Sequence, residues 1–218
     1  MQIGLLITCP EHDDATAYLS YFSKKIIEES EKKLIKVKRI GEKDLNMDNF
    51  SDILKQLDYR LIVLNGHGSY DSIFGHKKNV IVQVGKNEFL LKERIVYARS
   101  CNAGVKLGPE CMKNSKNGCF IGYELPFIFF MDSKWTTKPN NDKIAKLFLE
   151  PSNLVPISII KGRAAFEAHD NSKKQMLKTM NHLLTTAKEQ ETPFYLEALW
   201  NNYLGQVICG NDKAALET

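Results

Sequence analysis

Two residues of this chain have the types and the settings that nucleophilic catalysis requires. His67 follows a short apolar run in segment 61–69, Leu-Ile-Val-Leu-Asn-Gly-His-Gly-Ser, and Cys101 follows another in segment 95–104, Ile-Val-Tyr-Ala-Arg-Ser-Cys-Asn-Ala-Gly. The thiolate is the reactive form of a cysteine, and an imidazole is suited to take the thiol proton and return it. The pair therefore predicts attack on a carbonyl group, with Cys101 as nucleophile and His67 as proton carrier.

The elements around these residues predict a parallel sheet. Apolar runs of strand length lie at 2–8, 34–38, 60–64, 94–98 and 119–123, and helical periodicity spans about 15–26 and 50–57. Strands that alternate with helices form βαβ units, whose strands run parallel. Because the carboxyl ends of parallel strands open on one edge of the sheet, we expect His67 and Cys101 to lie at the same edge.

The remaining segments predict an insertion and a helical end. Val80, Val82 and Val84 alternate with other residues, a turn follows at 85–87, and Phe89 and Leu91 come next, which indicates a β-hairpin. Residues 132–141 have the composition of a loop, and helices are expected at about 141–149, 163–188 and 192–204. We therefore expect one domain over 1–218, with an α/β core at 1–130 and a mainly helical portion at 141–218.

Composition and charge exclude several classes of protein. The 218 residues are 43% hydrophobic and 26% charged, which is ordinary for a globular protein. The net charge of +4 is not accompanied by interleaved basic and aromatic residues, so no nucleic-acid partner is expected. The chain has no run of about 18 apolar residues and its amino-terminal apolar run is too short for a signal peptide. We therefore expect a cytoplasmic protein without membrane contact.

The cysteines and the other histidines offer weaker sites. The five cysteines are scattered, at 9, 101, 111, 119 and 209, without a CxxC pair, which is typical of a reducing compartment. Cys9 and His12 are spaced like two metal ligands, but no second pair completes a site, so neither a metal nor a cofactor is expected. His76, His169 and His182 lie in polar or helical contexts that predict surface positions.

Backbone groups near the pair are suited to a developing oxyanion. The amides of Gly68 and Cys101 are the expected donors. The glycines on both sides of His67 would let a substrate backbone approach closely. A helix expected at about 106–112 follows Cys101, and its amino terminus would favour the thiolate.

The order of these features resembles the caspase-like cysteine proteases, a superfamily that includes caspases, metacaspases, gingipains, clostripain, separase and the bacterial CHAT proteases. The motifs Asn65-Gly66-His67-Gly68 and Ser100-Cys101-Asn102-Ala103-Gly104 are most similar to the CHAT and gingipain branches, as is the later 118–123. The resemblance covers roughly residues 1–130. It implies a caspase-haemoglobinase-like fold, a mostly parallel sheet flanked by helices, and hydrolysis of peptide bonds by a Cys-His dyad. A third catalytic carboxylate is not required by the family pattern, and none is assigned.

Arg99 departs from the family, because metacaspases carry an acidic residue and caspases a glutamine two positions before the nucleophile. Side chains alternate along a strand, so Arg99 and Cys101 should point to the same side. In the family this position borders the substrate pocket, which implies an acidic or neutral substrate residue, with Glu124 and Asp132 grouped as further substrate-binding residues. Alternatively, Arg99 is a structural partner of Asp132 or Glu124.

Two functions are compatible with these observations. The first is a cytoplasmic cysteine endopeptidase acting on a protein or peptide, with a regulatory or activating protein partner, in a bacterial defence or cell-death system as the resemblance permits. The second is a catalytically inactive caspase-like module that binds a ligand or a partner at the same sheet edge. One cysteine reacting with an electrophilic probe far ahead of the other four would distinguish the first from the second.

Overall fold

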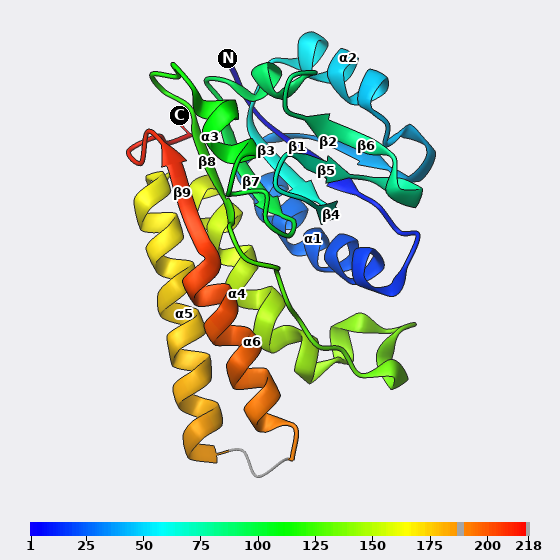
Figure 1. Cartoon of the computed structure of the whole chain (residues 1–218), viewed down its shortest axis with the longest axis vertical. Coiled ribbons are helices and arrows are strands. Elements are labelled where there is room, and N and C mark those ends of the chain that lie inside the picture. Colours follow the sequence, from blue (N-terminus) through cyan, green and yellow to red (C-terminus); the bar gives the residue numbers. More distant parts are fainter. Residues whose placement is uncertain (187–189, 217–218) are drawn as a thin grey trace.

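The computed structural model describes residues 1–186 and 190–216, and its centre is a sheet of six strands in the order β2-β1-β3-β7-β8-β9 (Figure 1). The first five strands in this order run parallel, and β9 pairs antiparallel with β8. The strands are β1 (Gln2–Cys9), β2 (Lys36–Gly41), β3 (Tyr59–Asn65), β7 (Ile95–Arg99), β8 (Cys119–Tyr123) and β9 (Gln206–Gly210). The predicted α/β fold with a mostly parallel sheet is confirmed.

Helices cover both faces of this sheet (Figure 1). The helices are α1 (Asp14–Lys32), α2 (Met47–Leu57), α3 (Leu107–Met112), α4 (Lys143–Ile160), α5 (Ala165–Thr186) and α6 (Thr192–Gly205). One buried cluster joins β1, β3, β7 and β8 to α1, α4 and α5, and the other joins the opposite face of the sheet to α2 and α3. The domain therefore has three layers.

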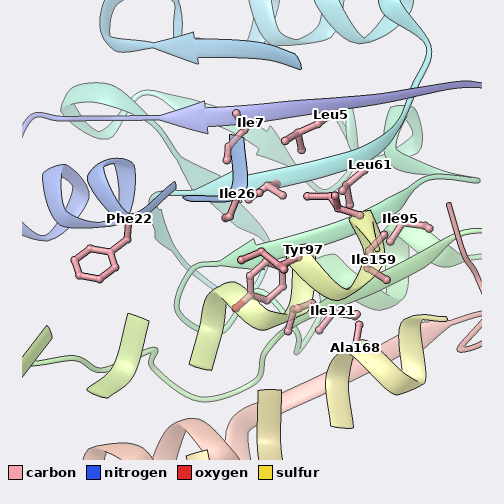
Figure 2. Packing of buried hydrophobic residues seen from close by; sticks show 14 of the residues in the cluster. Leu5, Ile7, Phe22, Ile26, Leu61, Ile95, Tyr97, Ile121, Ile159 and Ala168 are labelled. Carbon is pink, nitrogen blue, oxygen red and sulfur yellow. The ribbon is translucent and has the colours of Figure 1, made fainter. Parts of the chain in front are cut away.

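Strand alternation divides the core between these two faces. Leu5 and Ile7 of β1 pack on the side of α1 and α4, together with Ile26 and Ile159 (Figure 2). Leu6, between the two β1 residues, packs in the other cluster. Because successive side chains of a strand point to opposite faces, a strand that is apolar at every position is buried on both sides. Burial of both faces of the sheet therefore explains why the strand sequences are continuous apolar runs.

A second, smaller sheet holds His67. Its strands are β4 (His67–Gly68), β5 (Ser72–Phe74) and β6 (Val80–Gln83), and they pair antiparallel in the order β4-β5-β6. The prediction that the segment 80–84 forms a hairpin with the residues after the turn at 85–87 is therefore wrong. Residues 88–91 form a 3₁₀ turn (Glu88–Leu91), and β6 pairs with the preceding strand β5 instead.

The carboxyl-terminal part is helical, as expected, but it returns to the sheet. Helices α4, α5 and α6 share an apolar cluster of their own that extends away from the sheet (Figure 1). Strand β9 then follows α6 directly, and its pairing with β8 was not predicted. Its sequence, Gln-Val-Ile-Cys-Gly, is short and was not separated from the helical pattern before it.

Both ends of the described chain lie at the amino edge of the sheet. Met1 and Ala214 line the same hollow, together with Asn117, and the backbone N–H of Asn211 donates to the carbonyl oxygen of Gly118 at 2.8 Å. None of the helices in the described ranges is both long enough and apolar enough to cross a membrane.

Candidate active site

Three neighbouring strands end at the edge of the sheet that carries the candidate site. Strands β1, β3 and β7 are adjacent, and Asn65 at the end of β3 pairs with Arg99 at the end of β7. Asp13 follows β1, His67 follows β3 and Cys101 follows β7, each after a short turn. The expectation that His67 and Cys101 follow parallel strands to the same sheet edge is confirmed, and the structure adds that these two strands are adjacent.

Asp13 is the carboxylate that contacts His67. Its Oδ2 lies 2.7 Å from Nε2 of His67. Its Oδ1 accepts hydrogen bonds from the backbone N–H and the hydroxyl of Thr16, each at 2.8 Å, so Asp13 is also the N-cap of α1. Burial opposes the ionisation of Asp13, but the hydrogen bonds from His67 and Thr16 outweigh it and lower its pKa to about 2. Oδ1 therefore caps the amino terminus of α1, while Oδ2 contacts the imidazole of His67.

Sequence reasoning did not find this carboxylate. Asp13 lies 54 residues before His67, in the run Glu-His-Asp-Asp, where an aspartate before a helix is usually only a cap. The available signal was its place just after the first strand, because that strand ends at the same edge as the strand before His67.

The two glycines beside His67 are required by the packing of the chain itself. Gly66 has a φ of +155°, and a Cβ there would collide with the carbonyl oxygen of Phe74 in β5. A Cβ on Gly68 would collide with the carbonyl oxygen of Cys101 and lie 2.8 Å from the Cβ of Ser100. The expectation that these glycines admit a substrate backbone is thus replaced by a close approach within the chain. The close contacts of Gly68 also show that the His67–Gly68 strand lies directly against the Cys101 turn.

The backbone N–H of Gly68 is not used by the small sheet. The N–H of Ser69 donates to the carbonyl oxygen of Ser72 at 2.9 Å, and Gly68 is paired with Ile73 in the antiparallel register. Hydrogen-bonded and non-hydrogen-bonded pairs alternate along an antiparallel ladder, so Gly68 and Ile73 form a non-hydrogen-bonded pair. The Gly68 N–H therefore points away from β5.

Cys101 is one of the two partly exposed cysteines of the chain, the other being Cys209. The Sγ of Cys101 lies 3.9 Å from the carbonyl oxygen of Phe127. Burial raises the thiol pKa of Cys9, Cys111 and Cys209, and raises that of Cys119 to about 12. These four thiols are therefore poor nucleophiles at neutral pH.

The helix after Cys101 does not begin at the nucleophile. Helix α3 starts at Leu107, its N-cap is Lys106, and the turn 102–105 separates the cap from Cys101. Asn102 has a φ of +58°, so the chain turns sharply immediately after the thiol. The helix dipole acts only near the first turn of a helix. Because α3 begins six residues after Cys101, the expectation that its amino terminus stabilises the Cys101 thiolate is not supported.

Arg99 does not face a substrate pocket. Its side chain is 0% exposed, so the expectation that it binds the substrate residue before the scissile bond is wrong. Its Nε donates to Oδ1 of Asn65 at 2.8 Å, and one terminal nitrogen donates to Oδ1 of Asn153 at 2.7 Å. The other terminal nitrogen donates to the Ser23 hydroxyl at 2.7 Å and to the Leu19 carbonyl at 3.1 Å.

The structural alternative for Arg99 also differs from expectation. Its partners in the described chain are neutral oxygens, and neither Asp132 nor Glu124 is among them. Burial lowers the pKa of the Arg99 guanidinium, although hydrogen bonds satisfy its donors. The residue joins β3 and β7 to α1 and α4, directly beneath the turns that carry His67 and Cys101.

The two predicted carboxylates occupy different settings. Glu124 is exposed and follows β8, and the next residue, Leu125, accepts a hydrogen bond from the backbone N–H of Asn102 at 3.3 Å. Asp132 lies farther along the chain, where its Oδ1 accepts from the N–H of Lys134 at 3.0 Å and caps a 3₁₀ turn. The structure therefore brings Glu124 next to the Cys101 turn and gives Asp132 a capping role.

Two more histidines surround His67. The ring centroid of His12 lies 5.7 Å from that of His67 and 5.5 Å from that of His76. His76 is half-buried with a buried Nδ1, so it is not the surface residue that its context predicted. One donor atom from each of His12, Asp13 and His67 lies within 4.8 Å of the others, which is the spacing of a potential metal site.

Three adjacent strand ends thus carry a carboxylate, an imidazole and a thiol: the carboxylate contacts the imidazole, and the strand that carries His67 packs against the backbone of the Cys101 turn. Nε2 of His67 is taken by Asp13, so Nδ1 is the nitrogen left for proton transfer. This arrangement is suited to nucleophilic chemistry in which a carboxylate orients the base. No model of a known protein family matches the chain, and no curated protein matches it either.

Proposed function

We propose that this protein is a caspase-like cysteine endopeptidase that hydrolyses peptide bonds through a dyad of Cys101 and His67. The observation that carries the proposal is the close packing of the His67–Gly68 strand on the Cys101 turn, at the ends of adjacent parallel strands β3 and β7. Ligands of open parallel sheets bind at this edge. The order of strands and motifs along the chain supports a caspase-haemoglobinase-like arrangement of the core.

The reaction proceeds in two halves. Nδ1 of His67 takes the proton of the Cys101 thiol, and the thiolate attacks the scissile carbonyl carbon to form a tetrahedral intermediate. The amide N–H groups of Gly68 and Cys101 donate to its oxyanion. The imidazolium then gives its proton to the leaving amine, and a thioester to Cys101 remains. Water, deprotonated by His67, attacks this thioester and releases the carboxylic acid and the thiol.

Asp13 acts as a positioning residue in this scheme. A carboxylate that accepts from Nε2 fixes the ring orientation and favours the tautomer whose Nδ1 is free to accept a proton. It also stabilises the imidazolium that forms when His67 takes the thiol proton. Because the same carboxylate caps α1, the position of the base is coupled to the position of that helix.

The proposed substrate is a protein or peptide. Because Arg99 is buried, it does not contribute to selection of the residue before the scissile bond. Exposed Glu124, whose neighbour Leu125 contacts the Cys101 turn, is the remaining predicted candidate for contact with a substrate side chain, although its charge also acts on Lys173 of α5, and a carboxylate there favours a basic group. This reverses the acidic preference that a pocket-facing Arg99 would have produced. We further propose a cytoplasmic location and activation by a partner protein, as in the bacterial defence or cell-death systems of the related branches.

The test compares the wild type with Cys101→Ala, His67→Ala and Cys209→Ala on a library of unstructured peptides, with cleavage read by mass spectrometry. Cleavage should be lost in the first two variants and retained in Cys209→Ala, whose partly exposed thiol serves as the matched control. The double variant Cys101→Ala/His67→Ala should be little worse than either single variant, because the two groups act as a unit.

Labelling by a peptidyl electrophile provides a second readout that needs no knowledge of the substrate. One adduct per chain on Cys101, formed far faster than on any other cysteine and slowed in His67→Ala, supports the dyad. Labelling that spreads over several cysteines, together with no cleavage in the library, would contradict the enzyme and favour the inactive binding module.

A further inference from the structure

Three of the five histidines of the chain gather at one edge of the sheet, although 9 and 55 residues of sequence separate them from one another (67 to 76, and 12 to 67). His12 has two imidazole neighbours, His67 and His76, at centroid distances of 5.7 and 5.5 Å. Two of these imidazoles, those of His12 and His67, and the carboxylate of Asp13 offer the nitrogen and oxygen donors that Zn²⁺ binds. The proposed dyad uses only one of these imidazoles.

His12 has an unused donor atom that faces this cluster. Its side chain is 11% exposed, and its Nε2 is buried without a hydrogen-bond partner among the described residues. This atom lies 3.3 Å from Oδ2 of Asp13. Its other nitrogen, Nδ1, lies 3.5 Å from the hydroxyl of Thr16, which holds the ring so that Nε2 faces the carboxylate. Nε2 therefore faces the carboxylate without a hydrogen bond of normal geometry, and an ion placed between the two atoms would bind both.

The three donor atoms have a spacing that a small ion can bridge. Nitrogens of His12 and His67 and an oxygen of Asp13 all lie within 4.8 Å of one another. Zinc bonds of about 2.0–2.1 Å in tetrahedral geometry place ligand atoms about 3.3 Å apart. The Asp13–His67 contact of 2.7 Å must widen slightly, and both side chains are partly exposed, at 39% and 43%, so they have room to move.

We propose that His12, Asp13 and His67 form a binding site for a single Zn²⁺ ion, which switches the dyad off. Two imidazoles and one carboxylate leave the fourth position of a tetrahedral ion open for water. Among the histidine, cysteine, aspartate and glutamate side chains of the described residues, His12, Asp13 and His67 form the group whose donor atoms come this close together, so these three are the proposed ligands.

The inhibitory part of this inference rests on the proposed function. A zinc ion on Nε2 of His67 fixes the neutral imidazole in the tautomer that carries its proton on Nδ1. That nitrogen then cannot accept the thiol proton of Cys101, so the thiolate does not form and the peptide bond is not attacked. Removal of the ion restores the contact between His67 and Asp13.

Calorimetric titration with Zn²⁺ tests the site without any need for activity. Cys101→Ala should bind one ion per chain with the affinity of the wild type, because the thiol is not a ligand. His12→Ala should weaken binding at least about tenfold, and His182→Ala, which removes an exposed histidine of α5, should bind as the wild type does. Loss of binding in Cys101→Ala, or unchanged binding in His12→Ala, overturns the proposal.

Zinc inhibition of peptide cleavage tests the switch separately. Each protein is compared with its own metal-free cleavage rate, because His12 also lies beside the carboxylate that contacts His67, and His12→Ala should need at least about tenfold more Zn²⁺ for the same fractional inhibition. Activity that requires zinc, or equal inhibition of the wild type and His12→Ala, overturns the switch. If the chain cleaves no peptide at all, the titration with Cys101→Ala still decides whether the three residues bind zinc, so a failure of the enzyme and a failure of the site give different results.

Discussion

One carboxylate oxygen of Asp13 caps helix α1 and the other contacts His67. A substitution that preserves the cap can therefore test the contact with His67 separately. Asp13→Asn keeps a good N-cap, because asparagine and aspartate cap helices about equally well. It removes the negative charge opposite His67. We expect kcat/KM to fall at least about tenfold, short of the about 10⁴-fold loss reported for a buried triad aspartate, because Asp13 is 39% exposed and water can partly replace it.

The expected loss lies in kcat, since Asp13 does not contact substrate, and the unfolding free energy should fall by no more than about 1 kcal/mol, because the interactions that lower the pKa of Asp13 are partly exposed to solvent. The matched control is Asp14→Asn, which changes the neighbouring exposed carboxylate in the first turn of α1. Steady-state kinetics and urea denaturation measure the two quantities. An equal loss in both variants, or a change confined to KM, would contradict a role in positioning His67.

Single residues were predictable from the sequence where their surroundings were local. His67 and Cys101 each follow an apolar strand within a few residues, so their place at the sheet edge could be inferred. Asp13 and His12 reach the same place from a distant segment, and only the strand order β1-β3-β7 makes them neighbours. Arg99 was misplaced because alternation along a strand assigns a face but does not reveal what covers that face.

At the scale of elements, strand β4 can pack closely against the Cys101 turn because Gly68 has no side chain. Gly68→Ala places a methyl group against the backbone of Cys101 and Ser100, so one of the two segments must shift. We expect cleavage to fall by about 100-fold, the usual cost of misplacing reacting groups by about 1 Å. The unfolding free energy should drop by about 1–3 kcal/mol.

Gly41→Ala provides the comparison, because a Cβ there meets only one backbone oxygen, at an ordinary 3.6 Å, and its φ of −118° suits any residue. It should leave both cleavage and stability nearly unchanged. Peptide cleavage rates and urea denaturation of the two variants give the result. Wild-type cleavage by Gly68→Ala would mean that the strand and the turn are not in the contact described.

Elements were predicted well where a single period dominated the sequence. The strand expected at 119–123 has those bounds, and the buried runs before His67 and Cys101 form β3 and β7. The pattern at 80–91 failed because alternation alone does not distinguish a second hairpin arm from a 3₁₀ turn. Strand β9 was missed because its pairing with β8 joins segments far apart in the sequence.

At the scale of the whole molecule, Arg99 connects the sheet to two helices of the same face. Arg99→Lys keeps the charge but offers three donors to partners on β3, α1 and α4 that are arranged for a planar fork of five. We expect the unfolding free energy to fall by about 2–4 kcal/mol, since buried acceptors lose their donors. Urea denaturation measures the loss.

Arg163→Lys is the control, because its side chain is 62% exposed and it should change stability by less than about 0.5 kcal/mol. The cleavage-site preference of Arg99→Lys, measured on the peptide library, should match that of the wild type. A changed preference with unchanged stability would restore Arg99 to the substrate pocket.

The junction between α5 and the late strand β9 gives the stability of the molecule a dependence on pH. His169 is half-buried, and its Nε2 lies 3.0 Å from the carbonyl oxygen of Gln206. Burial lowers the pKa of His169, with a smaller contribution from Lys173, against the opposing effects of the Gln206 carbonyl and Asp170. The unfolded chain therefore takes up this proton first as the pH falls.

The contribution of His169 to stability is complete above the unfolded pKa of about 6.5 and is lost as the pH falls toward the folded pKa. His169→Gln, which retains a donor for the carbonyl, should unfold with a flatter pH dependence than the wild type between pH about 6.5 and 5. His182→Gln, at an exposed position of α5, should keep the wild-type slope. Urea denaturation at several pH values compares the slopes, and equal slopes in all three proteins would contradict this role.

The two ends of the described part of the chain lie close to one another, which makes them suitable positions for labels. Met1 and Ala214 border one hollow at the amino edge, while Asp13, His67 and Cys101 follow strands at the carboxyl edge. A fluorophore pair attached near the two ends would transfer energy efficiently in the native state and poorly after unfolding. Such a sensor reports global folding from the side of the domain remote from the chemistry, so loss of fold and loss of reactivity can be followed in one cuvette.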